Sequence, residues 1–220
     1  MIKRRIAMSL GGVVLGAIAV GFFKLAAFGV DPFQSFMSGI DQLIPIQFGT
    51  LYVIVNAVLL IFSLIVDRHN IGLATFINLF LLGYITQFTY EFLKTNIVDP
   101  SIPVRAASML FAIVVICFGS ALYMTADLGV STYDAVAIVF AYKWKLWKFK
   151  YIRICTDLVC VIVGIVLFLL GGGSPREIPT FVGVGTIITA FFMGPLIEFF
   201  NEKVARPLLK EKTEDNKEEA

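Results

Sequence analysis

"GVDPFQSFMSGI", residues 29–40, lies between two long apolar runs, and "GVSTYDAVAIVF", residues 129–140, takes the same place a hundred residues later. Each segment is too short to cross a bilayer, because a spanning helix needs about 20 apolar residues. Their similarity predicts that the chain contains one structural unit twice. The sequence around the two segments indicates which helices belong to that unit.

The composition is that of a membrane protein. Hydrophobic residues make up 58% of the 220 residues and charged residues 15%, and the mean hydropathy of +0.87 lies far from the balance of a soluble domain. Continuously apolar stretches favour spanning helices over barrel strands, whose residues alternate. The sequence therefore predicts an all-α polytopic membrane protein with six spans. These spans cover residues 6–23, 49–66, 71–93, 104–126, 151–170 and 179–200.

Short loops rich in lysine and arginine predict the orientation. The basic segments are "MIKRR" at the start, "DRHN" at 67–70, "YKWKLWKFKYIR" at 142–153 and the polar tail. They alternate with loops that carry few basic residues, after the first, third and fifth spans. Because cytoplasmic loops carry the excess of Lys and Arg, we expect both termini to lie in the cytoplasm. Trp144 and Trp147 are expected to anchor the protein at that interface, and a nucleic-acid patch is the less favoured interpretation.

The repetition extends along the whole chain. A shift of 100 places Gly29 on Gly129 and Phe33 on Tyr133, a shift of 101 places Asn56 on Asp157, and a shift of 111 places Gln87 on Glu198. Three spans are an odd number, so the second copy would enter the membrane in the opposite sense, as an inverted repeat. The predicted divisions are a first repeat at 1–100, a second repeat at 101–203 and a cytoplasmic polar tail at 204–220. The third and sixth spans are expected to face each other through their small residues.

The two short segments, predicted as helices at 31–44 and 131–142, have two interpretations. Their polar residues permit interfacial helices that lie on each membrane surface. Alternatively they are re-entrant half-helices whose starts point into the protein, since Pro32 suits a first helical position and Asp31, Ser131 and Thr132 are good caps. A third interpretation, in which both segments span the membrane, would place Asp41 in lipid and is less favoured.

Few ionisable groups lie within the apolar scaffold. Asp157 is inside a predicted span, where an aspartate costs about 2.5 to 3.5 kcal/mol at the bilayer centre. An ion pair with Arg153, one turn earlier, would stabilise it. The alternative is a proton or cation carrier with Asn56 as its uncharged counterpart. Asp134 and Glu198 lie nearer the ends of helices, and Lys24 either reaches the outer interface or pairs with Asp31.

The candidate solute or ion site combines the polar residues of the short segments and spans. Half-helix starts would offer unpaired N–H groups to an anion, so Ser131 and Thr132 are the expected anion contact. The charge of Asp31 favours an amine or a coupling cation instead, and the two together would select a zwitterion or a polar organic solute. The complete set of candidate residues is Asp31, Gln34, Asn56, Gln87, Ser131, Thr132, Asp134, Asp157 and Glu198.

Several stretches carry a resemblance to a known family. The "GVDP" segment, "DRHNIGLATFINLFLLG" at 67–83, "LGVSTYDA" at 128–135 and "TFVGVGTIITAFFMGPLIEFF" at 180–200 are similar to the YczE/YyaS/YitT family of bacterial integral membrane proteins. The resemblance covers about residues 5 to 200. It implies a bacterial plasma-membrane location and an activity that is either unassigned or related to transport. Gln87 stands where we expect an acidic residue in many relatives, which argues against proton coupling through that half.

The sequence favours a secondary transporter or exporter of a small polar organic solute. One alternative is a membrane subunit that serves a separate partner complex, and another is a scaffold. A homo-oligomer is compatible with each of these functions. No nucleotide-binding loop, nucleophile elbow or metal-ligand set is found, so we expect neither an enzyme nor a cofactor. The three cysteines fall within spans and are expected to be packing thiols. The first apolar run is longer than a signal-peptide core and is expected to remain as a span.

Overall fold

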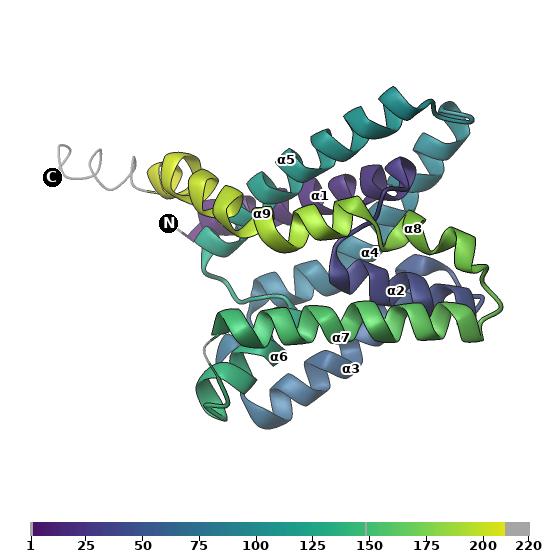
Figure 1. The fold of residues 1–220 in the computed structure, drawn as a ribbon. Helices are drawn as coiled ribbons and strands as arrows, with labels where there is room; N and C mark the ends of the chain where they lie inside the picture. The colour runs from purple at the N-terminus through teal and green to yellow at the C-terminus, as the bar shows by residue number, and fades with distance from the viewer. Residues whose placement is uncertain (1, 148, 210–220) are drawn as a thin grey trace, which may run out of the picture.

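The computed structural model describes residues 2–147 and 149–209, which contain helices and no strand. Six helical segments of this part are long and apolar enough to cross a membrane, as predicted. The two short segments also form helices near their predicted bounds. The helices of Figure 1 are α1 (Ile2–Ala26), α2 (Pro32–Leu43), α3 (Phe48–Val66), α4 (Leu73–Asn96), α5 (Ile102–Ala126), α6 (Thr132–Ile138), α7 (Phe149–Leu170), α8 (Ile178–Phe181) and α9 (Val184–Phe200).

Two details differ from the predicted elements. The sixth span is interrupted at its beginning, where Gly183 caps α9 after the short helix α8. The second short helix is only seven residues long as an α-helix and continues as a π-helical turn over Val139–Lys143. Of the polar tail predicted at 204–220, residues 204–209 complete the last helical turns. Residues 210–220 lie outside the described part of the chain.

The outer surface of the helices is apolar. Ile65 is 80% exposed, Phe88 70% and Phe191 73%, and many other large apolar side chains are exposed. A soluble monomer rarely exposes so much contiguous apolar surface. The same surface suits contact with lipid tails, while the backbone polar groups are satisfied within each helix. The helices are therefore surrounded by the lipid bilayer.

Helices α1 and α5 form the central seam and run antiparallel. They have the same length of 25 residues, and a shift of 100 aligns one with the other from end to end. Small residues allow their close approach. A Cβ added at Gly12 would lie only 2.5 Å from the carbonyl oxygen of Gly119.

Reciprocal arginine contacts close both ends of this seam. Arg105, at the start of α5, donates to the carbonyl oxygen atoms of Ala26 and Ala27 at 2.7 and 2.8 Å. Arg5, at the start of α1, donates to the carbonyl oxygen of Ala126 and pairs with Asp127, both at 3.3 Å. Cations at a helix C-terminus satisfy its unpaired carbonyl groups and its partial negative charge. Each half of the chain thus caps the first span of the other half.

The helices divide into two bundles. In the first bundle α1 packs along α5, with α4 against α1 and α9 against α5; in the second, α2 packs along α7 and α6 packs against α3 and α7. We call these the seam bundle and the short-helix bundle. Each bundle takes helices from both halves of the chain. Figure 1 shows α1, α5 and α9 above and α3, α6 and α7 below, with α2 and α4 between them.

One side of the interface between the bundles is closely packed. Helix α4 contacts α3 across it, whereas α9 makes no comparable contact with α7 among the described residues. The prediction that the third and sixth spans face each other is wrong, because α4 and α9 lie on opposite sides of the central α1–α5 pair. The open position at Gly194, where an added Cβ would have no neighbour within 4 Å, agrees with this correction.

Candidate functional site

A central cavity of about 150 Å³ lies between the two bundles. The seam bundle lines it with α1, α4, α5 and α9, and the short-helix bundle with α2, α3, α6 and α7. A water molecule takes about 30 Å³ of liquid, so the cavity suits a few waters or a solute of a few heavy atoms. Its wall includes carboxylate, amide, hydroxyl and guanidinium groups together with aromatic rings.

The start of α2 brings Asp31 to this cavity. Gly29 makes the turn after α1 with a φ of 102°, a conformation that glycine adopts without steric cost. Asp31 is the cap residue, and its carboxylate accepts a hydrogen bond from the N–H of Gln34 at 3.1 Å. Pro32 follows at the first helical position, where its missing N–H costs no hydrogen bond. The sequence signals for this helix start are confirmed.

The start of α6 repeats the same construction a hundred residues later. Gly129 turns the chain with a φ of 111°, and Ser131 accepts from the N–H of Asp134 at 3.1 Å. The Ser131 hydroxyl in turn donates to the Asp134 carboxylate at 2.7 Å. Thr132 is 1% exposed and donates to the side-chain oxygen of Asn56, which ties α6 to α3.

Equivalent aromatic residues meet where the two short helices begin. The rings of Phe33 and Tyr133 stack with their centroids 4.9 Å apart and their planes inclined by 24°. Tyr52 of α3 meets Phe33 edge-on at 6.1 Å. All three residues line the cavity, so an aromatic surface forms part of its wall.

Arg153 of α7 organises the charged part of the site. Its guanidinium lies 2.7 Å from the Asp134 carboxylate and 3.5 Å from that of Asp157, so the predicted ion pair along α7 is present. The same guanidinium lies 4.5 Å from the ring centroid of Tyr133. The Tyr133 hydroxyl donates to Asp157 at 2.6 Å. One cation therefore serves two carboxylates in this network.

Asp31 lies beside that network and interacts with the charges of Arg153 and Asp157 at longer range. No ion pair of Asp31 occurs among the described residues, and Lys24 does not neutralise it. The Lys24 ammonium instead lies 3.1 Å from the ring centroid of Phe48, toward the end of the molecule opposite the start of α1. The cavity and its immediate wall thus hold the carboxylates of Asp31, Asp134 and Asp157 against the single guanidinium of Arg153.

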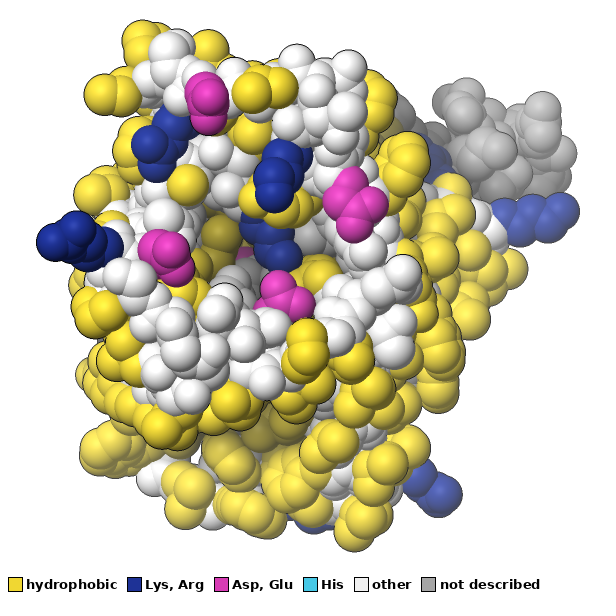
Figure 2. Space-filling model, turned by 90° about the vertical axis from the view of Figure 1, so that its right-hand side faces the viewer, with side chains coloured by type: hydrophobic (Ala, Val, Ile, Leu, Met, Phe, Trp, Pro, Cys, Tyr) yellow, Lys and Arg dark blue, Asp and Glu magenta, His cyan; other side chains and the backbone are white. Residues whose placement is uncertain are grey.

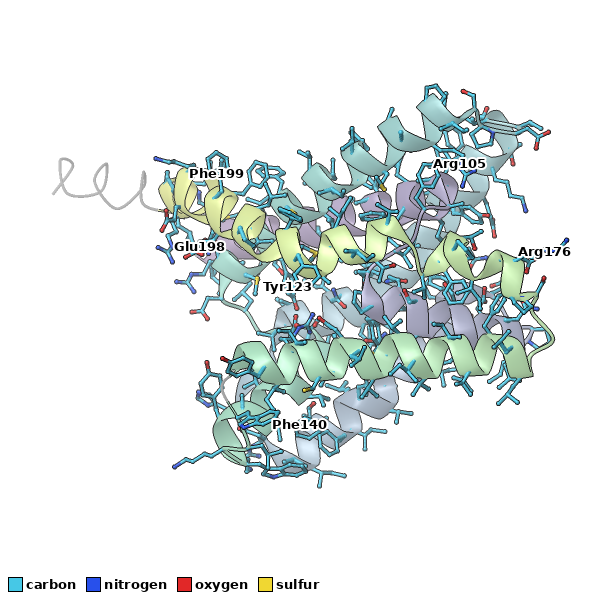
Figure 3. The ribbon with its side chains drawn as sticks, viewed as in Figure 1. Arg105, Tyr123, Phe140, Arg176, Glu198 and Phe199 are labelled. Carbon is cyan, nitrogen blue, oxygen red and sulfur yellow. The ribbon has the colours of Figure 1, made fainter. Side chains whose placement is uncertain are left out.

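Two polar atoms in the cavity wall are buried without a hydrogen-bond partner. They are the side-chain oxygen of Gln34, a residue 3% exposed, and the hydroxyl of Tyr123, a residue 8% exposed. Figure 3 shows Tyr123 at mid-height, between the seam bundle and α7. An unsatisfied buried polar group costs about 1 to 3 kcal/mol. A molecule in the cavity that reached these atoms would supply the missing hydrogen bonds.

Most of the predicted site residues gather here. Asp31, Gln34, Asn56, Ser131 and Asp134 line the cavity. Thr132 and Asp157 lie one layer behind and contact Asn56 and Tyr133.

Gln87 and Glu198 do not reach the site. Gln87 accepts from the N–H of Gly49 at 3.0 Å, at the start of α3. Glu198 is exposed near the end of α9, as Figure 3 shows. The structure thus places this predicted pair apart from the cavity and apart from each other.

Sequence reasoning missed several residues of the wall. Tyr52 and Asn78 bond each other across α3 and α4 at 3.3 Å, and Ser120 and Tyr123 come from α5. Hydroxyl and amide groups within otherwise apolar spans are the signal that could have indicated them. The signal lacks specificity, because the spans hold other such residues that point elsewhere.

A wider vestibule opens at the end of the molecule opposite the start of α1. Two adjoining hollows of about 560 and 430 Å³ share Lys24, Ala27, Tyr90 and Thr180. Figure 2 looks onto this end and shows a hollow bordered by basic and acidic side chains. Along α1 and α2, Val20 and Gln34 of the cavity lie one helical turn from Lys24 and Ser38 of the vestibule. The vestibule therefore lies above the cavity on the same helix faces.

Residues 3–202 match a family described as "Family of unknown function (DUF6198)". An uncharacterized protein of Haemophilus influenzae is 26% identical over 196 residues, which cover 88% of this chain and 81% of that protein. The uncharacterized membrane protein YczE of Bacillus subtilis is 23% identical over 193 residues, covering 86% of this chain and 81% of that protein. No solved structure matches. These matches confirm the predicted resemblance to YczE-like membrane proteins.

Proposed function

The chain belongs to this family of unknown function, DUF6198, and from that premise we propose that it is a secondary transporter of a small polar organic solute. The solute would bind in the central cavity and pass between the two sides of the bacterial plasma membrane. Both termini would lie in the cytoplasm, as the basic loops favour. The proposal includes no catalytic step.

One observation carries this proposal: a polar cavity between two helical bundles contains buried atoms that lack a partner. Gln34 and Tyr123 provide those atoms. Polar groups inside a membrane protein are expensive, and they commonly mark the path of a substrate or ion. A purely structural core would gain stability by pairing these groups or replacing them with apolar ones.

The proposal includes an inverted repeat. Support comes from the antiparallel α1 and α5, and from the reciprocal capping by Arg5 and Arg105. Two reciprocal backbone bonds add to it: Gly185 donates to Phe28 at 2.7 Å, and Ala74 donates to Leu128 at 2.9 Å. Inverted repeats of this kind commonly place a substrate site near the bilayer midplane, where the repeats meet.

Re-entrant helices α2 and α6 belong to the same proposal. The starts of both helices meet in the interior, where Phe33 stacks on Tyr133. Gln34, Ser35 and Thr132, in the first turns, are all at most 3% exposed. An interfacial helix would instead present its polar first turn to water and headgroups. The burial of these turns favours the re-entrant interpretation.

Movement of one bundle against the other would provide access from each side in turn. The α3–α4 contact would act as the hinge side, because it is the packed side of the interface. The opposite side, between α7 and α9, would open and close. The vestibule would be the approach to the cavity from one side of the membrane.

Metabolite pools in cells with and without the protein provide the test, measured inside and outside the cells. A solute that accumulates on one side only when the protein is absent identifies the cargo and its direction. The purified chain should then exchange that solute in liposomes. Activity that requires a separate partner complex would favour the alternative role of a membrane subunit. Metabolite pools that are the same with and without the protein would contradict a transport function.

A further inference from the structure

We propose that the central cavity binds a primary ammonium group of its solute, with Asp31 as the counter-ion. This inference rests on the proposed function and narrows the substrate class to small organic amines in their cationic form. It starts from the charge of the site. Three carboxylates face one guanidinium there, and Asp31 is the one that forms no ion pair with it within 4 Å.

The hydrogen-bonding groups of the cavity match an ammonium group. The carboxylate of Asp31, the buried side-chain oxygen of Gln34 and the buried hydroxyl oxygen of Tyr123 are acceptors in the wall of one small cavity. A primary ammonium carries three N–H donors and no acceptor. An ammonium group bound beside Asp31 would neutralise that carboxylate and bring N–H donors to the wall that holds the unpartnered atoms.

The aromatic rings favour the same ligand. Phe33 and Tyr52 line the cavity, and ring faces attract cations, by about 2 kcal/mol or more when the cation is desolvated. Tyr133 lines the cavity as well, but Phe33 and Arg153 already contact its ring. Arg153 already uses this interaction on Tyr133 from the α7 side.

The groups expected to bind an anion are already engaged within the protein. The hydroxyl of Ser131 donates to Asp134 and that of Thr132 donates to Asn56, so both are already engaged. Arg153 is paired with two carboxylates. The expected anion contact at Ser131 and Thr132 is thus filled by the protein itself, which favours a cation over the zwitterion expected from the sequence.

Probes of similar size and different charge test the inference. Propylammonium, propionate and n-butanol are similar in shape and are respectively cationic, anionic and neutral. Their binding to the whole chain in lipid nanodiscs can be measured by calorimetry, together with the thermal shift each one causes. We expect propylammonium to bind at least about tenfold more tightly than the other two, because its charge-assisted bonds are the stronger ones.

Matched variants assign the contacts. Asp31→Asn keeps a good helix cap but removes the charge, and should weaken propylammonium binding by about tenfold or more. Tyr123→Phe removes only the unpartnered hydroxyl and should weaken it by roughly threefold. Asp41→Asn, in the vestibule rather than the cavity, should leave binding within about twofold.

Different results would contradict the inference and the proposed function. Equal binding of propionate or n-butanol, or undiminished propylammonium binding to Asp31→Asn, would overturn the inference. A thermal shift with sodium ions and none with propylammonium would also overturn it, by assigning Asp31 to an inorganic cation. Propylammonium binding without any transport would refute only the proposed function. If a solute is transported and added propylammonium does not inhibit that transport, only the inference is refuted.

Discussion

At the residue scale, Arg153 holds together the charged part of the candidate site. Asp134 lies on α6 and Asp157 on α7, and both bind the one guanidinium. The sequence predicted the partner four residues away, since that spacing places two side chains on one helix face. It could not predict Asp134, because no local rule brings α6 to α7. Ion pairs within one helix can be predicted from the sequence, whereas ion pairs between helices that are distant in the sequence cannot.

Replacement of Arg153 should be more harmful than replacement of either carboxylate. Arg153→Gln leaves two neighbouring carboxylates without a cation, whereas Asp157→Asn leaves the guanidinium paired with Asp134. We expect Arg153→Gln to lower the free energy of unfolding on the order of 2 kcal/mol, less than for a fully buried pair because the side chain is 29% exposed. Denaturant unfolding in detergent measures this. Equal losses for the two variants would show that the shared network has no such role.

Thr132 supports the site from behind. Its hydroxyl donates to Asn56, and neither group has access to solvent. Thr132→Val keeps the shape, removes that donor and should cost about 1 to 3 kcal/mol of stability. Thr95→Val is the matched control, because the Thr95 hydroxyl is exposed and bonds its own helix. Thermal unfolding compares them, and equal melting temperatures for the two variants would contradict the assigned role of the Thr132–Asn56 bond.

At the element scale, the sequence predicted most helix bounds, but it did not predict which helices pack against each other. Apolar length predicted the spans, and the cap residues Asp31 and Ser131 marked the short helices. The pairing of α2 with α7 and of α6 with α3 exchanges helices between the halves, and no local pattern encodes it. The shift of 100 did contain a missed clue, because it places Arg5 on Arg105, the two residues that cap the seam.

The seam between α1 and α5 should tolerate no added side chain at its closest point. A Cβ at Gly12 would lie 2.5 Å from the Gly119 carbonyl oxygen, whereas one at Gly11 would meet nothing within 4 Å. Gly12→Ala should therefore force the helices apart and cost about 1 to 3 kcal/mol. Gly11→Ala, its neighbour in the same helix, should be neutral or stabilising by up to about 1 kcal/mol. Reversed effects on thermal stability would contradict the packing of this seam.

At the scale of the whole molecule, the orientation follows from the charges of the loops and is open to labelling. We expect cysteines at Asp41 and Ser174, at the vestibule end, to react with an impermeant thiol reagent added to intact cells. A cysteine at Lys145, at the opposite end, should react only after the membrane is opened. The parent Cys117, Cys155 and Cys160 are first replaced by alanine. Reaction of position 145 in intact cells would contradict the cytoplasmic assignment of that end.

The central claim is that the cavity between the bundles opens to each side of the membrane in turn. Ser120, on the cavity wall of α5, is the most direct probe because Ser120→Cys changes one atom. In the cysteine-free background, its reaction with an impermeant thiol reagent is measured in right-side-out and in inside-out vesicles. A transporter with alternating access should be labelled in both preparations. Labelling in only one preparation, or in neither, would contradict the claim.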